Sequence, residues 1–109
     1  MKVIQDKKYY TITEVSEMLK VNASKIRFWE TEFTFLKPKK NKKGDRFFDE
    51  ENIEILQMIV YLLKVRRFTI EGAKKKMKDD IKGIREEQAM RESLLKVKSF
   101  LEVLENSLP

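Results

Sequence analysis

A concentrated set of lysine and arginine side chains is the part of this sequence with the clearest chemistry. Between residues 20 and 46, nine basic side chains stand against three acidic ones, so this stretch carries the whole net charge of +6. Such side chains neutralise phosphates and donate hydrogen bonds to them, and arginine also donates to base edges. A focused positive patch therefore indicates a polyanionic partner, although a solvated charge run is the alternative while the patch is considered alone.

Catalytic and metal-binding chemistry has little support in the sequence. The chain has no cysteine and no histidine, and it lacks a phosphate-cradling loop of the type G-x-x-x-x-G-K-[ST]. Acidic residues cluster at 49–51 and 79–80, where helices are expected to begin, and capping and the helix dipole explain acids there. We therefore expect no enzyme activity, no metal and no cofactor. No run of 18 apolar residues occurs, so a cytoplasmic, nucleoid-associated protein without a membrane partner is expected.

Two short helices precede the basic stretch and extend into it. Thr11 and Glu14 have the spacing of a capping box, which predicts a first helix ending near Lys20. Asn22 is the next capping candidate and opens a second helix that extends to about Phe33. Two short helices separated by about three residues are typical of a helix-turn-helix.

The second helix has two different sides. At about 100° per residue, one side is apolar and is expected to be buried: Ile26, Trp29 and Phe33. The opposite side carries polar, basic and aromatic groups: Ser24, Arg27, Phe28 and Thr31, with Lys25 at the flank. Phe28 has two open explanations, which are burial under the following loop and contact with the ligand backbone.

A short β-hairpin, or wing, is expected after the second helix. Pro38 prevents helix, and the turn residues of 41–44 separate two short extended runs. Its tip carries four lysines and its return strand an arginine: Lys39, Lys40, Lys42, Lys43 and Arg46. Leu36 and either Phe47 or Phe48 are expected to pin it to the helices.

Two further helices complete the expected domain. Asp49 caps one that continues to about Val65, and its wide apolar stripe predicts burial on more than one side. Thr69 caps the next, through Lys78.

The last part of the chain has the pattern of a coiled coil. Apolar residues recur at spacings of four and three along residues 90–108 and form a heptad seam: Met90, Leu94, Val97, Leu101, Leu104 and Leu108. Leu95, Phe100 and Val103 are expected to widen this seam. A helix of about 28 residues is a rod of roughly 40 Å, too long for the preceding helices to cover. Dimerisation is therefore preferred over packing back on the same chain. The expected domains are 8–78, a winged helix-turn-helix, and 79–109, a dimerisation helix.

In their order, the motifs resemble the mercury-resistance (MerR) family of winged-helix regulators. They read "YYTITEVSEMLKVNASKIRFWE", then "LKP", then "KKGDRFFDEENIEILQMIVYLLKVRRFTIEGAKKKM", over roughly residues 9 to 78. The resemblance implies a mainly α fold, four short helices with a hairpin wing, and a homodimer joined by an antiparallel coiled coil. It also implies binding to a pseudo-palindromic promoter element in double-stranded DNA, and distortion of that element for RNA polymerase.

The resemblance also implies roles for single residues. Arg27 and Phe28 match the family's Arg-Tyr-Tyr and are expected at the DNA backbone, although Phe28 lacks the tyrosine hydroxyl. Ser24 and Lys25 are expected near base edges. Arg46 and the tip lysines are expected at flanking phosphates, and Lys20 stands where the family usually has a turn glycine.

The expected function is therefore sequence-specific DNA binding by a homodimeric transcriptional regulator without a recognisable effector-sensing domain. Two alternatives remain open. One is an architectural or excision-factor-like DNA-binding protein, and the other is an adaptor whose last helix binds a foreign protein.

Overall fold

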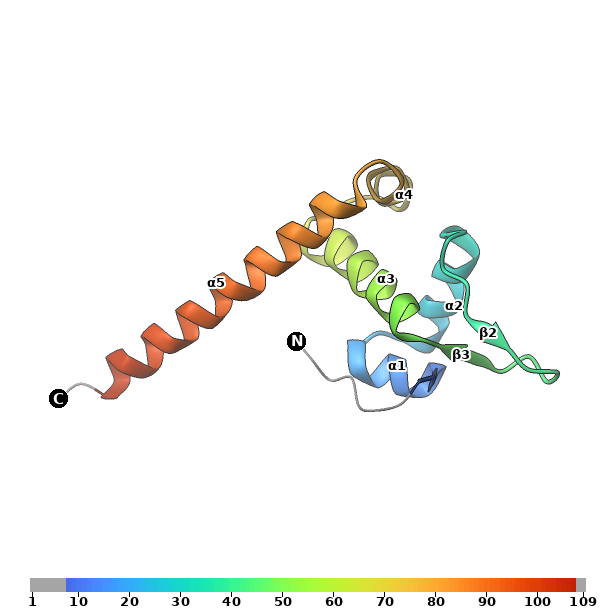
Figure 1. The fold of residues 1–109 in the computed structure, drawn as a ribbon, viewed down its shortest axis with the longest axis horizontal. Helices are drawn as coiled ribbons and strands as arrows, with labels where there is room; N and C mark the ends of the chain where they lie inside the picture. The colour runs from blue at the N-terminus through green and yellow to red at the C-terminus, as the bar shows by residue number, and fades with distance from the viewer. Residues whose placement is uncertain (1–7, 108–109) are drawn as a thin grey trace.

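Five α-helices and three very short strands make up the described part of the chain. The structure is a computed structural model that describes residues 8–107. In chain order the elements are β1 (Tyr10–Thr11), α1 (Ile12–Leu19), α2 (Ala23–Glu32), β2 (Lys39–Lys40), β3 (Arg46–Phe48), α3 (Glu50–Val60), the π-helical turn η1 (Tyr61–Val65), α4 (Ile70–Asp79) and α5 (Ile81–Ser107). Figure 1 shows the first helices and the hairpin gathered at one end, with α5 extending away from them. The predicted fold class, a mainly α winged helix-turn-helix followed by a long terminal helix, is confirmed.

The two helix starts of the helix-turn-helix differ in how they are capped. The predicted capping box of α1 is present, because Thr11 Oγ1 accepts from Glu14 N at 3.2 Å and Thr11 N donates to Glu14 Oε1 at 2.9 Å. Asn22 stands at the N-cap of α2 as predicted, but its side chain makes no capping hydrogen bond. Between the helices, Lys20 adopts the left-handed conformation with φ 55°.

The wing is part of a three-stranded antiparallel sheet with strand order β1-β3-β2. The pairing of β2 with β3 places Lys40 opposite Arg46, and β1 pairs with the other edge of β3. Strand β1 was not predicted from the sequence. A strand of two residues carries no period-2 pattern, so periodicity cannot detect it.

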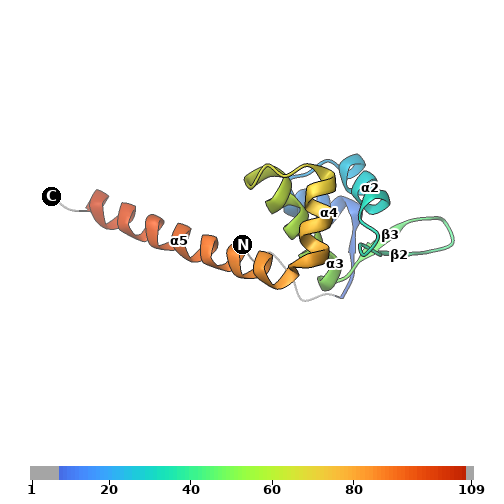
Figure 2. The same ribbon diagram turned by 90° about the horizontal axis from the view of Figure 1, so that it is seen from above.

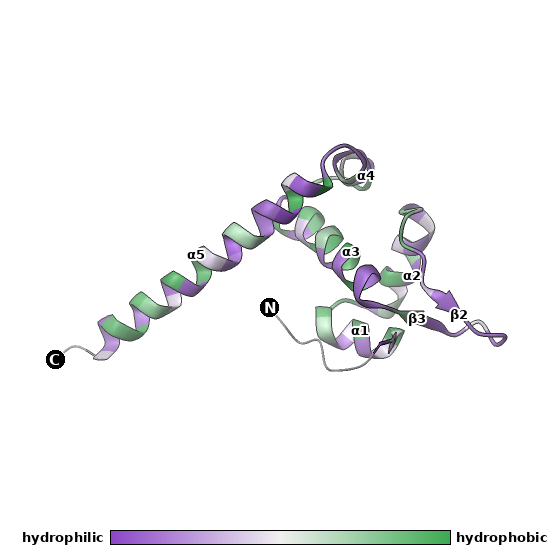
Figure 3. Ribbon diagram, viewed as in Figure 1, coloured by the Kyte–Doolittle hydropathy of each residue, from purple (hydrophilic) through white to green (hydrophobic). Residues whose placement is uncertain are grey.

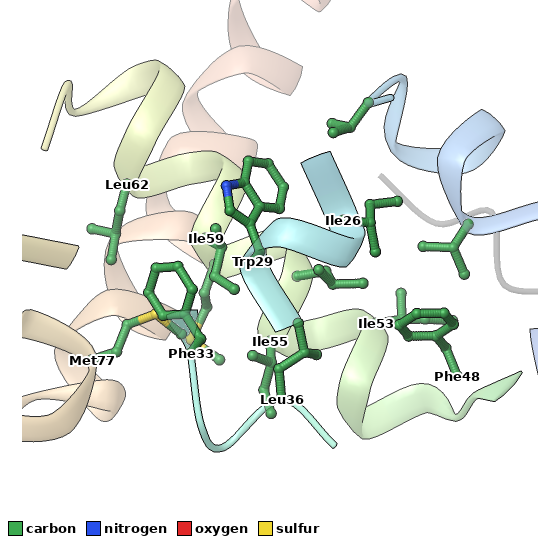
Figure 4. Close-up of a cluster of buried hydrophobic side chains, with 14 of the residues drawn as sticks. Ile26, Trp29, Phe33, Leu36, Phe48, Ile53, Ile55, Ile59, Leu62 and Met77 are labelled. Atoms are coloured by element: carbon green, nitrogen blue, oxygen red, sulfur yellow. The ribbon is translucent and has the colours of Figure 1, made fainter. Parts of the chain in front are cut away.

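One hydrophobic core holds the helices and the base of the wing together. Ile26, Trp29 and Phe33 of the second helix are buried as predicted, and Leu36 and Phe48 hold the hairpin against them (Figure 4). Helix α3 passes through the centre of this core. The prediction of burial on more than one side is confirmed by its buried residues: Ile53, Ile55, Leu56, Met58 and Ile59.

Asn52 is a buried polar residue in this core, and it fixes the chain where it enters the wing. Its Oδ1 accepts from Lys37 N at 3.0 Å, and its Nδ2 donates to Lys37 O at 3.3 Å. Buried amides need such partners, so this pair of bonds also explains why a polar side chain is tolerated there.

The third predicted helix changes its winding before it ends. It is α-helical to Val60, and residues Tyr61–Val65 then form the π-helical turn η1. Thr69 caps the next helix as predicted, and Ala73 and Met77 of α4 are buried. Helix α4 ends at Asp79, so the predicted domain division after residue 78 falls in its last turn.

Helix α5 makes the molecule long and narrow, with principal extents of 61 × 31 × 21 Å. Seen from above, the wing and α5 extend in opposite directions (Figure 2). Of the described residues of α5, Ile84 is the buried one, close to its start. Within residues 8–107, no helix is both long enough and apolar enough to span a bilayer.

Candidate nucleic-acid interface

The outward side of α2 carries the predicted contact residues. Ser24, Lys25 and Arg27 are all exposed. Phe28 is 51% exposed, so it is not buried under the following loop, which was one of its two explanations. The core residues of α2 occupy the opposite side of the helix, and this leaves Arg27 and Phe28 facing solvent.

The turn of the wing is built around the side chain of Asn41. Its Oδ1 accepts from Lys43 N at 2.9 Å and from Asp45 N at 3.0 Å, while its Nδ2 donates to Asp45 Oδ2 at 3.1 Å. Gly44 has φ 88°, a conformation that other residues rarely adopt. These bonds define a compact tip on which Lys42 and Lys43 are exposed. The tip is among the most hydrophilic parts of the molecule (Figure 3).

Glu30 joins the wing to the recognition helix. Its carboxylate forms ion pairs with Lys40 Nζ of β2, at 3.1 Å, and with Arg46 Nε of β3. Burial of this carboxyl opposes its ionisation, but hydrogen bonds from Arg46 and Lys40 outweigh that effect and lower the pKa of Glu30. Arg27 precedes Glu30 by three residues, so both lie on adjacent turns of the same part of α2. The base of the wing is therefore fixed beside the turn that bears Arg27.

Lys39 also has a neighbour within the molecule. Its Nζ lies 5.3 Å from the centre of the Tyr9 ring. Hydrogen bonding to Tyr9 raises the pKa of Lys39. Lys39 remains exposed.

The predicted site residues thus fall into two groups. Lys25, Arg27, Lys42 and Lys43 form no ion pair with any residue among 8–107. By contrast, Lys40 and Arg46 are paired with Glu30. Glu30 was not predicted as a site residue. Its position three residues after Arg27, inside a basic stretch, was a usable signal that a cation of the same stretch would neutralise it.

Further basic residues follow α3, but several of them form ion pairs with acidic side chains of the same chain. Residues 64–78 contain seven basic side chains and one acidic one, a local surplus hidden by the balanced count of the whole second half. Lys74 pairs with Glu32 at 3.4 Å and with Glu71 at 3.2 Å. Through Glu32, this pair also fixes α4 to the end of α2.

The root of α5 is attached to η1 by a polar cluster. Tyr61 Oη donates to Glu87 Oε1 at 2.9 Å, and Arg66 forms an ion pair with the same carboxylate. The bonds from Tyr61 and Arg66 lower the pKa of Glu87. Together with buried Ile84, this cluster sets the direction in which α5 leaves the domain.

The heptad seam faces away from the domain that carries it. At about 100° per residue, the five described seam residues lie within an arc of about 80°. They are between 46% and 66% exposed: Met90, Leu94, Val97, Leu101 and Leu104. The seam therefore does not pack against its own domain in this chain. Leu108, the sixth predicted seam residue, lies outside the described residues.

The predicted widening of the seam is wrong for two of its three residues. Phe100 lies beside the seam, but Leu95 and Val103 lie about 140° from its centre at 100° per residue. Leu95 instead lines an open apolar groove of about 370 Å³ between α1, η1 and α5, together with Met18, Leu19 and Val60.

The fold and this surface define a class, that of winged helix-turn-helix proteins with a terminal coiled-coil-type helix. The profile of the MerR HTH family of regulatory proteins matches residues 10–80. The chain belongs to the MerR helix-turn-helix family, which confirms the resemblance seen in the sequence.

Two solved structures are similar over most of the chain. A MerR-family transcriptional regulator from Bacillus thuringiensis is 30% identical, with a TM-score of 0.50, over 90% of this chain and 89% of that chain. HiNmlR, a MerR-family regulator lacking the sensor domain and solved bound to promoter DNA, is 16% identical, with a TM-score of 0.55, over 90% of this chain and 86% of that chain. No curated protein sequence matches the chain.

Proposed function

We propose that this protein is a transcriptional regulator that binds double-stranded DNA sequence-specifically as a homodimer. One observation carries the proposal. The wing is fixed by ion pairs to Glu30 of α2, and exposed Arg27 lies on the adjacent turn of the same helix. This placement supports a single surface that combines a recognition helix with a basic wing. HiNmlR, of the same family and similar fold, is bound to promoter DNA.

In the proposed complex, α2 enters the major groove. Ser24, Lys25 and Arg27 face base edges or the adjacent backbone, and Lys42 and Lys43 neutralise flanking phosphates without reading sequence. About four phosphate contacts per subunit give about eight per dimer. On counterion release, the affinity then falls by roughly three to five orders of magnitude between 50 and 200 mM salt.

The proposed dimer is an antiparallel coiled coil of two α5 helices. Five exposed apolar residues at heptad spacing, turned away from their own domain, are the support for it. With the seam symmetric about Val97, the two Ile84 residues stand roughly 40 Å apart at 1.5 Å per residue. The recognition helices are carried beyond these two points, and the inverted symmetry of the dimer fits an inverted repeat of two half-sites.

The proposed DNA target is a promoter, and the proposed second partner is RNA polymerase. Such a regulator acts at the nucleoid. The DNA-binding domain and the dimerisation helix together account for residues 8–107, so no part of that range is assigned to effector sensing.

Selection from a random pool of DNA duplexes tests the proposal. We expect enrichment of an inverted repeat whose half-site centres are one helical turn, or a whole multiple of it, apart. Arg27→Ala should abolish the enrichment, whereas Lys78→Ala should leave it intact. Tight binding to every duplex with no enriched sequence would instead indicate an architectural protein. No binding to any duplex would reject both functions.

A further inference from the structure

We infer that Glu30 is a positioning residue for sequence discrimination, and that Arg46 acts on DNA only through Glu30. This inference rests on the proposed function. It replaces the role expected for Arg46 from its motif position, which was a direct phosphate contact.

The geometry places one carboxylate against a cross-strand pair of cations. Lys40 and Arg46 are register partners on β2 and β3, and like charges directly opposite each other on paired strands repel. Glu30, which belongs to neither strand, binds both of them. The hairpin is thus most stable in the orientation in which it reaches Glu30, so the carboxylate sets the position of the wing along α2.

Arg46 is more buried than the lysines that are available to a ligand. The side chain of Arg46 is 22% exposed and that of Glu30 is 14% exposed. A phosphate that captured Arg46 would leave the largely buried carboxylate with Lys40 as its one cation, and removing a partner from a buried charge is unfavourable. Lys42 and Lys43, at the exposed tip, have no such competing partner among the described residues.

Wing position matters for discrimination because Lys42 and Lys43 help to fix the register of the protein on the duplex. A wing released from Glu30 still carries Lys42 and Lys43, so attraction to any DNA persists. What is lost is the coupling between phosphate contacts and the base edges that α2 faces. Discrimination should therefore fall while general affinity for DNA stays.

Salt dependence and site preference, measured together, separate the two roles. The logarithm of affinity falls with the logarithm of salt by about 0.9 for each phosphate contact. Lys43→Gln, the matched control for a true phosphate contact, should reduce the slope of a dimer by about 2. It should weaken binding to the selected site and to a scrambled duplex by similar factors, because the wing stays fixed to Glu30 and Lys42 still contacts the backbone. Arg46→Gln should leave the slope unchanged and reduce the preference for the selected site over the scrambled duplex by on the order of tenfold, comparable to one mismatched base pair.

Two further variants keep the test decisive. Glu30→Gln should also reduce the preference, and its slope should steepen because two cations are released. The exchange Glu30→Arg with Arg46→Glu restores an ion pair at the same net charge and should restore both quantities, even if Arg46→Gln alone fails to fold. An Arg46→Gln slope that flattens as in Lys43→Gln, or an exchange that does not restore preference, overturns the inference. Failure of the wild-type protein to prefer any sequence rejects the proposed function instead.

Discussion

The carboxylate of Glu30 makes the basic surface sensitive to acid. Hydrogen bonds from Arg46 and Lys40 lower the pKa of Glu30 below its usual 4.5, against the opposing effect of burial. A carboxyl whose pKa is lower in the folded state stabilises that state above its unfolded pKa. The contribution is lost as the pH falls through the lower, folded value.

Comparison of the wild type with Glu30→Gln tests this linkage. The difference in free energy of unfolding between them should be constant between about pH 5.5 and 8 and should shrink as the pH falls below about 4.5. Chemical denaturation at a series of pH values measures it. Glu86→Gln is the control, since Glu86 is exposed and forms no ion pair with residues 8–107. A Glu30→Gln difference that does not change with pH would contradict the linkage.

At the level of secondary-structure elements, the junction between α1 and α2 contains strain at Lys20. Its φ of 55° is in the left-handed region, which costs an L-residue with a side chain roughly 1–2 kcal/mol. Glycine adopts this conformation freely, at the cost of more entropy in the unfolded chain.

Lys20→Gly should therefore stabilise the protein by about 1 kcal/mol, which corresponds to a rise in Tm of about 4–8 °C for a domain of this size. Thermal unfolding followed by circular dichroism measures the change. Lys20→Ala removes the same charge and side chain but keeps the strain, so it should give no such rise. Equal Tm values for the two variants would show that φ at this position is not the cause.

The helices were predictable because each one has a local signal. The Thr11 capping box, the Asp49 and Thr69 caps and the apolar periodicity of α3 belong to single segments, and the structure confirms all of them. The π-helical winding of η1 was not predictable in this way. Its first residue, Tyr61, contacts Glu87 of α5, which lies 26 positions further along the chain, and no local pattern encodes such a contact.

The candidate site was predictable in residue type but not in pairing. Charge and helical spacing correctly predicted that Arg27, Lys42 and Lys43 are exposed. They did not separate Arg46 from Lys43, because the pairing of Arg46 with Glu30 joins residues that are 16 positions apart. Leu95 and Val103 of α5 were assigned to the seam because they are apolar. Their angular positions around the helix place them on another side of it.

For the molecule as a whole, the proposed dimer depends on the seam of α5. Leu101→Asp places a charge on the seam, and desolvating it there would be strongly unfavourable. We expect sedimentation equilibrium to give about twice the 13.1 kDa chain mass for the wild type and about one chain mass for this variant.

The control for this experiment is Ser99→Asp, which adds the same charge to the opposite side of the helix at about 180° from the seam centre. It should remain dimeric. A wild type that is monomeric at micromolar concentration, or two variants that behave alike, would reject the seam as the contact between subunits.

In the proposed dimer, the exposed seam makes occupancy of a promoter depend on gene dosage. A single chain presents one DNA-binding head, whose lone contact with a half-site is weak compared with two linked heads. Below the dissociation constant of the dimer, mass action makes the dimer population rise with the square of the chain concentration. A small change in synthesis or degradation of the chain would then change promoter output sharply, with no small-molecule signal required.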